Sequence, residues 1–233
     1  MSAEPAYAYS GVDNLEIMAE AVNYNAFLLG LVTAQARPHD QILDFGAGTG
    51  VLMRPLVAAG YHVSCIEPDE QLRARLQADG LSAHATIESV PPQSFDLIYT
   101  FNVLEHILDD ADAARSLRER LRPGGRLVVY VPAFPILYSA LDRKVGHFRR
   151  YRYAGLAALL RQAGLRIERI GYQDCLGFAA TLLFKLAGND TGTINRRALI
   201  LFDRCVFPLS RFLDRFAGRW VGKNLFAVAR RDE

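Results

Sequence analysis

Apolar and polar positions follow two different periods in turn along most of the chain. Short apolar runs that are typical of buried strands alternate with longer stretches in which apolar residues recur every three or four positions, as in amphipathic helices. This alternation predicts an α/β fold, with a doubly wound and mainly parallel sheet covered by helices on both faces. The expected strands are 41–45, 61–67, 81–86, 94–101, 126–132, 165–173 and 223–231, and the expected helices are 14–36, 49–60, 69–80, 110–125 and 154–164.

Two long connections interrupt this rhythm. Residues 133–153 separate the fifth expected strand from the next helix, and residues 174–222 separate the last two expected strands. Connections of this length are more often functional segments or subdomains than plain loops. We therefore divide the chain into an N-terminal helical cap (1–36), an α/β core (37–173), a helical insertion (174–222) and a final core strand (223–233).

Composition argues against several classes of protein. The chain has 233 residues, 51% of them hydrophobic, and a formal net charge of only +2, so no overall attraction to nucleic acid is expected. Cys65, Cys175 and Cys205 lie far apart without metal-ligand spacing, which favours a reducing compartment and gives no reason to expect a metal. We expect neither a signal peptide nor a membrane span, and hence a cytoplasmic location.

A glycine-rich turn follows the first expected strand. In the stretch QILDFGAGTGVL, Asp44 ends the apolar run, and three glycines follow at every second position from Gly46 onward. Such a turn brings the N–H groups of a helix N-terminus close to a ligand, and side chains there would stand in the way. The turn alone is not specific, because dinucleotide-binding enzymes have a similar one, but their third glycine would fall on Val51.

The turn resembles the D-x-G-x-G-x-G motif of class I S-adenosylmethionine-dependent methyltransferases. Three further blocks resemble that family in the right order, namely CIEPD, ESVPPQSFDLIYTFNVLEHI and LRPGGRLVVYVP. The resemblance covers about residues 14–173 together with the closing strand. It implies a seven-stranded Rossmann-like sheet whose last strand is antiparallel, and S-adenosylmethionine as the cofactor.

The resemblance also implies roles for individual residues. Glu67 would hold both ribose hydroxyls of the cofactor, and Asp44 would bind the methionyl amino group or orient the glycine turn. Asn102 and Val103 would line the sulfonium end. Where relatives often have an acid for the adenine, this chain has Thr86, so that contact would come from the backbone one residue further on. The implied cofactor residues are Asp44, Gly46, Ala47, Gly48, Gly50, Glu67, Pro68, Ile87, Asn102 and Val103.

The connection 133–153 offers groups for a methyl acceptor. Methyl transfer mainly needs alignment of nucleophile, methyl and leaving group, and an oxygen nucleophile must also lose a proton. His147 would serve as base or substrate anchor with Asp142 orienting its ring, whereas the alternative is a solvated basic loop with a packed histidine. His106 is interpreted as structural. The candidate catalytic residues are His147 and Asp142, and the candidate substrate residues are Tyr138, Arg149, Arg150 and Tyr151.

Apolar residues and arginines share the insertion 174–222. This combination fits a surface on an anionic membrane at the inner face, a lid over an apolar substrate, a helical cap on the sheet, or a homodimer interface. The leading interpretation of the whole chain is a methyltransferase for a small or lipid-like acceptor, with O- or N-methylation favoured. The alternatives are a NAD-type oxidoreductase and a catalytically silent S-adenosylmethionine-binding protein.

Overall fold

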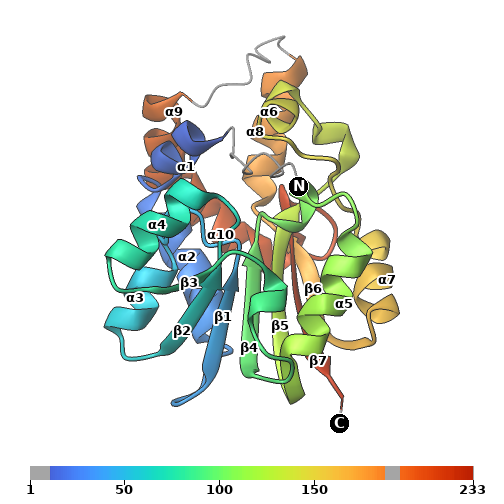
Figure 1. The fold of residues 1–233 in the computed structure, drawn as a ribbon. Coiled ribbons are helices and arrows are strands. Elements are labelled where there is room, and N and C mark those ends of the chain that lie inside the picture. Colours follow the sequence, from blue (N-terminus) through green and yellow to red (C-terminus); the bar gives the residue numbers. More distant parts are fainter. Residues whose placement is uncertain (1–10, 187–194, 233) are drawn as a thin grey trace, which may run out of the picture.

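Seven strands form one sheet in the computed structural model, which describes residues 11–186 and 195–232 (Figure 1). The strand order is β3-β2-β1-β4-β5-β7-β6; neighbours from β3 to β5 are parallel, and β7 is antiparallel to both β5 and β6. The prediction of a doubly wound sheet with an antiparallel last strand is confirmed. The strands are β1 (Gln41–Phe45), β2 (His62–Ile66), β3 (Ser82–His84), β4 (Phe95–Phe101), β5 (Leu121–Pro132), β6 (Leu165–Gln173) and β7 (Asn224–Arg231).

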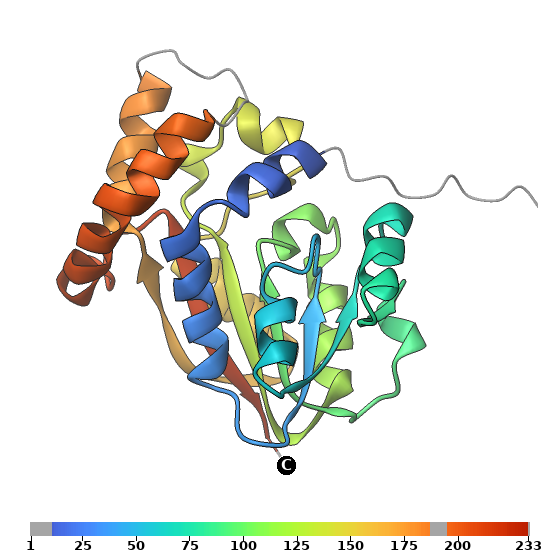
Figure 2. The same cartoon turned by 90° about the vertical axis from the view of Figure 1, so that its left-hand side faces the viewer.

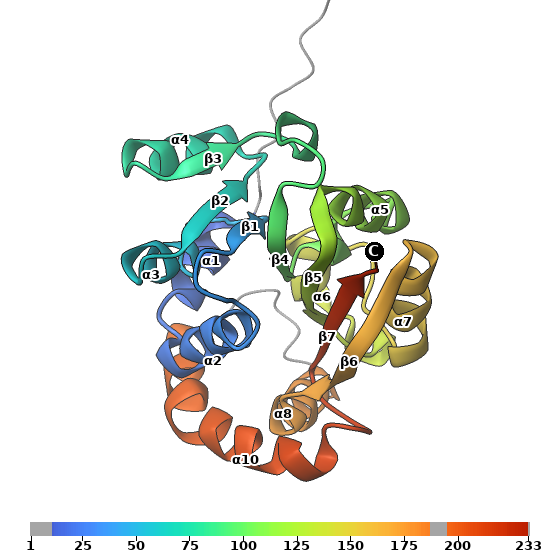
Figure 3. The same cartoon turned by 90° about the horizontal axis from the view of Figure 1, so that it is seen from below.

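The sheet separates two hydrophobic cores, because successive side chains on a strand point to opposite faces. On β5, Leu127 and Val129 pack with α5 and α7, whereas Val128 and Tyr130 pack with α2, α3 and α4 on the other face (Figure 3). Both cores are apolar, which is the reason the strands have near-continuous hydrophobic sequences. The covering helices are α2 (Val22–Thr33), α3 (Met53–Ala58), α4 (Glu70–Ala78), α5 (Asp110–Arg120) and α7 (Tyr153–Gln162).

The N-terminal segment forms two helices instead of the single helix expected over 14–36. Helix α1 (Val12–Met18) ends before α2 begins. The carboxylate of Asp203 accepts hydrogen bonds from the N–H groups of Asn23 (3.0 Å) and Tyr24 (2.8 Å), in the first turn of α2. A helix start needs partners for its first N–H groups, and here a residue of the insertion supplies them. The remainder of the expected cap, residues 1–10, lies outside the described residues.

Several helices gather beyond the carboxyl ends of the parallel strands (Figures 1 and 2). Two of them, α8 and α9, belong to the insertion between the last two strands, which is helical as expected where it is described; residues 187–194 lie outside that part. Within the described ranges no helix is long and apolar enough to cross a bilayer. The remaining helices of the described residues are α6 (Ala140–Lys144), α8 (Cys175–Leu186), α9 (Arg196–Leu201), a π-helix (Phe202–Val206), α10 (Phe207–Ala217), and 3₁₀ turns at Ile87–Ser89, Leu104–His106 and Pro135–Leu137.

Candidate active site

A cavity of about 380 Å³ opens at the carboxyl ends of β1, β2 and β4, where α/β sheets bind their ligands. Its volume lies within the range of small-molecule and cofactor sites. Helix α1 and the 133–153 connection also border it. Of the residues assigned from the sequence, the cavity is lined by Asp44, Gly46, Ala47, Gly48, Glu67, Pro68, Asn102, Val103, Asp142, His147 and Arg150.

The glycine turn forms one wall of this cavity. Gly46 has a φ of +89°, and a Cβ atom there would stand 2.3 Å from Cγ2 of Val103, so a side chain is excluded by both conformation and space. The N–H of Gly46 donates to the carbonyl of Ile66 at 2.9 Å, which ties the turn to the end of β2. The N–H of Gly48 donates to Oε2 of Glu67 at 2.6 Å. The turn and the acid that follows β2 are therefore one hydrogen-bonded unit.

Two buried carboxyl groups face the same space from β1 and β2. Burial raises the pKa of Asp44 to about 7, and the charge of Glu67 adds to the effect. Burial also raises the pKa of Glu67, although the N–H groups of Asp69 and Gly48 oppose that rise. The N–H of Gly48 donates to Oε2 of Glu67, and the N–H of Asp69 donates to Oε1. Each carboxylate oxygen therefore has a second lone pair left to accept a hydrogen bond from a ligand hydroxyl. These acceptor oxygens thus fit an ammonium beside Asp44 and a diol beside Glu67.

Asn102 ends β4 in a left-handed conformation, with a φ of +56°. Its N–H donates to the carbonyl of Tyr130 at 2.7 Å, and its side-chain amide donates to the hydroxyl of Tyr24 at 3.4 Å. Asparagine tolerates this backbone region better than most residues. The position links the end of β4 to α2, and Asn102 lines the cavity.

The 133–153 connection brings His147, Asp142 and Arg150 together. Oδ1 of Asp142 lies 2.6 Å from Nδ1 of His147 and accepts from Nε of Arg150 at 2.8 Å, while Oδ2 accepts from Nη2 of Arg150 at 2.9 Å. The N–H and hydroxyl of Ser139 also donate to Asp142. Hydrogen bonds and charge from His147 and Arg150 outweigh burial and hold the pKa of Asp142 far below its ordinary value. The imidazole is therefore fixed in orientation, with Nε2 directed away from Asp142.

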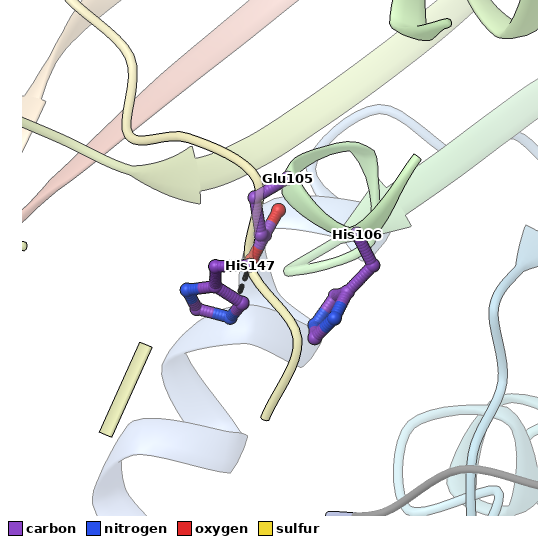
Figure 4. Close-up of side chains that lie close together, drawn as sticks. All are labelled: Glu105, His106 and His147. Atoms are coloured by element: carbon purple, nitrogen blue, oxygen red, sulfur yellow. Dashed lines mark ion pairs between the residues drawn. The ribbon is translucent and has the colours of Figure 1, made fainter. Parts of the chain in front are cut away.

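Sequence reasoning missed Glu105 and treated its neighbour His106 as structural. Both residues follow β4, and their side chains lie beside that of His147 in the lining of the cavity (Figure 4). Oε1 of Glu105 lies 3.8 Å from Nε2 of His147, and the His106 and His147 rings stand edge to face with centroids 4.5 Å apart. Burial raises the pKa of Glu105 to about 8 and lowers that of His106 to about 4. The signal in the sequence was the LEH triplet, which begins three residues after the last residue of a strand that ends at the ligand edge.

Three substrate residues assigned from the sequence lie elsewhere. The segment around Tyr151 is extended and pairs with Ala133 at the end of β5, so neighbouring side chains point to opposite sides. Arg149 and Tyr151 both reach Asp110 of α5, at 2.8 Å and 2.6 Å, and only Arg150 faces the cavity. Tyr138 donates its hydroxyl to the carbonyl of His147 at 2.6 Å, so it holds the loop.

Two assigned cofactor residues also do not line the cavity. Gly50 is needed for packing, because a Cβ there would stand 2.6 Å from Cδ2 of Leu76. The carbonyl of Ile87 accepts from Nε of Arg120 at 3.2 Å, which directs that backbone group toward α5. The adenine contact expected from the backbone near Ile87 stays a prediction.

Comparison with known proteins places this architecture in a family. A family model described as a methyltransferase domain matches residues 16–170, more than half of the chain. The chain belongs to this family. Over 153 residues, the chain is 31% identical to the ubiquinone biosynthesis O-methyltransferase of Xylella fastidiosa (strain M23); the match covers 56% of this chain and 62% of that relative. The corresponding enzyme of Aromatoleum aromaticum is 30% identical over 128 residues, 51% of this chain and 50% of that protein. The matched part thus spans about half to three fifths of these relatives.

Solved structures agree with the fold of this chain. An S-adenosylmethionine-dependent methyltransferase from Mesorhizobium loti superposes with a TM-score of 0.57 at 21% identity, covering 87% of this chain and 96% of that one. The complex between the Haloferax volcanii Trm112 methyltransferase activator and a methyltransferase gives a TM-score of 0.65 at 14% identity, over 96% and 97%. The class I family, the fold and S-adenosylmethionine as the family's cofactor are thereby confirmed. The oxidoreductase alternative gains no support from these matches.

Proposed function

We propose that this chain transfers a methyl group from S-adenosylmethionine to an oxygen atom of a small or lipid-like acceptor. The observation that carries the proposal is the single cavity that joins Asp44 and Glu67 on one side to His147 on the other. Residues suited to the two ends of a cofactor and a residue suited to an acceptor hydroxyl therefore face one space. The relatives named above are O-methyltransferases, which favours oxygen over nitrogen.

The cofactor end is assigned by charge and hydrogen bonding. Glu67 accepts hydrogen bonds from the ribose hydroxyls, and Asp44 pairs with the methionyl ammonium. The absence of a side chain at Gly48 lets the ligand approach the backbone that Glu67 holds. When bound there, S-adenosylmethionine supplies an electrophilic methyl group on a sulfonium, and the chain's task is to place an oxygen in line with it.

The acceptor end is assigned to His147. Nδ1 of the imidazole is held by Asp142, so Nε2 is the atom available to an acceptor hydroxyl. His147 receives the hydroxyl proton or fixes the oxygen by a hydrogen bond, and Asp142 and Arg150 act through it as positioning residues. The methyl bond to sulfur breaks as the bond to oxygen forms, which leaves a neutral thioether.

The test uses a radiolabelled methyl donor with quinol-type phenols as acceptors, chosen because of the relatives' name. His147→Ala should lower turnover by a factor of about 10²–10⁴, the usual effect of losing a general base, while S-adenosylhomocysteine binding stays close to wild type. Replacing the exposed His62 by alanine is the matched control. Turnover equal to wild type in His147→Ala would show that His147 is neither the base nor the anchor of the acceptor hydroxyl. Binding without any methylation would favour the silent cofactor-binding protein.

The outer face of the insertion supports a second proposal, peripheral contact with an anionic membrane. Four apolar residues in α10 and directly after it recur at spacings of three and four. Each of these side chains is more than half exposed: Leu209, Phe212, Phe216 and Trp220. Arg204, Arg215 and Arg219 are exposed on the same segment. A basic border around an apolar stripe is the pattern of helices that lie in the interface of anionic bilayers. At such a membrane surface, the protein would encounter an acceptor that has a lipid-like tail.

Vesicle flotation tests this surface. Wild-type protein should float with phosphatidylcholine vesicles that contain phosphatidylglycerol and should be released as salt rises. Phe216→Ser combined with Trp220→Ser should abolish flotation, whereas Leu108→Ser, at an exposed apolar residue elsewhere, should not. Flotation that survives the double substitution contradicts the proposal. A concentration-dependent mass that the double substitution lowers would instead assign the stripe to a homodimer.

A further inference from the structure

Lys223 is a cation in the cavity that the methyl-transfer proposal does not use. It stands directly before β7, is partly buried and lines the cavity. Its ammonium forms no hydrogen bond or ion pair with any residue that the structure describes. Burial lowers the pKa of Lys223, although the charge of Asp174 opposes that fall. A lysine withdrawn from water is normally paired with an acid, so a ligand that supplies an acid would account for this one.

The acids around this cation are bound by other groups. Asp174 accepts hydrogen bonds from an N–H in the first turn of α8 at 2.9 Å and from the hydroxyl of Ser210 at 2.8 Å, so it caps that helix. Asp142 is held by two nitrogens of Arg150, at 2.8 Å and 2.9 Å. The carboxylate of Asp203, which also lines the cavity, caps α2. These carboxylates are therefore engaged in holding the fold, and the ammonium keeps its capacity to bind an anion.

Lys223 lies on the acceptor side of the cavity. Its carbonyl accepts a hydrogen bond from the N–H of Ala133 at 2.8 Å, at the start of the connection that carries His147. In the sheet order, β7 follows β1, β4 and β5 (Figure 3). Three strand spacings of about 4.8 Å place the start of β7 roughly 14 Å from the end of β1. Lys223 is thus remote from Asp44 and Glu67, which are assigned to the cofactor.

The other groups that line the cavity near this end of the sheet indicate the rest of the ligand. The insertion contributes apolar side chains, namely Leu199, Phe202 and Phe207. Asn224, the first residue of β7, is only 5% exposed and lines the cavity, and its side-chain amide has no hydrogen bond with a described residue. An unpaired ammonium, an unpaired amide and an apolar wall together fit an acid group on an apolar body.

We propose that Lys223 binds a carboxylate of the methyl acceptor, which makes the acceptor a hydroxylated acid; this rests on the proposed function. One ammonium and one uncharged amide suit the single negative charge of a carboxylate. A phosphate would favour a bidentate arginine, but the fork of Arg150 is taken by Asp142. The carboxylate keeps its charge at Lys223, and the hydroxyl oxygen beside His147 receives the methyl group.

The test compares acids with their neutral amides. Protocatechuate and the longer caffeate each carry a phenol hydroxyl and a carboxylate, and their primary amides have nearly the same shape without the charge. In isothermal titration, with and without S-adenosylhomocysteine, at least one acid should bind about ten-fold or more tightly than its amide. Lys223→Met should remove this preference. Lys144→Met, the same substitution at an exposed lysine, is the matched control and should retain it.

Three results of this titration overturn the carboxylate site. The first is equal affinity of acid and amide in both pairs. The second is a lack of binding by all four compounds at millimolar concentrations. The third is a preference for the acid that survives in Lys223→Met.

Unfolding and cofactor binding show whether the substitution acts on the acid alone. Without ligand, Lys223→Met should melt close to the wild-type temperature, because the fold loses no hydrogen bond or ion pair. The preferred acid should raise the melting temperature of wild type more than that of the variant. S-adenosylhomocysteine should bind both proteins alike. Weaker binding in the variant would assign Lys223 to the carboxylate of the cofactor and would overturn its role toward the acceptor.

The proposed function can fail separately from the carboxylate site. No binding of S-adenosylhomocysteine to wild type would reject the methyltransferase proposal, while an acid preference that depends on Lys223 would leave the carboxylate site standing. Methylation of an amide with the same KM as its acid would reject the carboxylate site and leave methyl transfer standing.

Discussion

Asp44→Asn is expected to stabilise the cofactor-free protein at neutral and alkaline pH. Asp44 is only 4% exposed, and burial raises its pKa from 3.8 to about 7. The folded state therefore keeps a proton that the unfolded chain loses between pH 3.8 and about 7. Stability falls with rising pH wherever the folded state binds more protons, so this group destabilises the fold progressively across that window.

The magnitude follows from the width of the window. Each pH unit is worth about 1.4 kcal/mol, so a window of about three units gives about 4 kcal/mol at pH 8 or above. Asparagine introduces amide hydrogens, and leaving them without acceptors would cost about 1–3 kcal/mol. We expect Asp44→Asn to be more stable than wild type by about 1–3 kcal/mol at pH 8.5. Near pH 4 it should show no such gain. The neighbouring groups that titrate or carry charge are Glu67, Tyr99 and Cys65.

Urea unfolding at several pH values from 4 to 8.5 measures this difference. The gap between variant and wild type should widen as pH rises and level off above about pH 7. Asp13→Asn, at an exposed carboxylate in α1, is the matched control. A constant gap for Asp44→Asn, or a variant that is less stable at pH 8.5, would refute the reasoning. The stabilised variant should bind S-adenosylhomocysteine more weakly than wild type.

Three further substitutions test separate parts of the site. Glu67→Gln should weaken S-adenosylhomocysteine binding in isothermal titration by roughly 1.5–3 kcal/mol, through loss of charge-assisted hydrogen bonds; an unchanged affinity would mean that another residue holds the ribose. Gly46→Ala should destabilise the fold in urea by about 1–3 kcal/mol, because its Cβ would overlap Val103; adding Val103→Ala should recover part of the loss, and no recovery would point to φ alone. Asp203→Ala should cost about 0.5–2 kcal/mol by removing the cap of α2, and a smaller change would show that solvent replaces the cap.

Local signals in the sequence were enough to predict the sheet and its ligand edge. Strands and helices have different hydrophobic periods, which the sequence shows. The turn after β1 needs a residue without a side chain at Gly46, because of its positive φ and the nearby Val103. The carboxyl ends of β1 and β2 are neighbours in any such sheet, so the sequence alone predicts that Asp44 and Glu67 lie close together. The contacts of Glu67 with the N–H groups of Gly48 and Asp69 were not predictable, since they depend on the exact backbone course of two turns.

Features that depend on distant pairing could not be predicted. The start of α2 is capped by Asp203, which lies 180 residues from Asn23 along the chain. Arg149 and Arg150 look alike in sequence, and only the pairing of Tyr151 with Ala133 decides which of them faces the cavity. Glu105 looks like an ordinary polar residue after a strand. It is buried because the 133–153 connection folds over it, with the N–H of Phe148 donating to the Glu105 carbonyl at 2.8 Å.

The π-helix joins α9 and α10 into one continuous helical segment, and this segment contributes both to the cavity and to the exposed apolar stripe. Phe202 and Asp203 line the cavity, and the segment then continues without a break into α10 with its exposed stripe. A force that shifts α10 therefore acts on the cavity wall, and a ligand that fixes Phe202 acts on α10. Such coupling is equal in both directions: any factor by which an outer surface changes affinity for the acceptor is the factor by which the acceptor changes affinity for that surface. Binding at the exposed stripe of α10, as proposed above, would therefore change the affinity of the cavity for its ligand by the same factor as the ligand changes the affinity of the stripe.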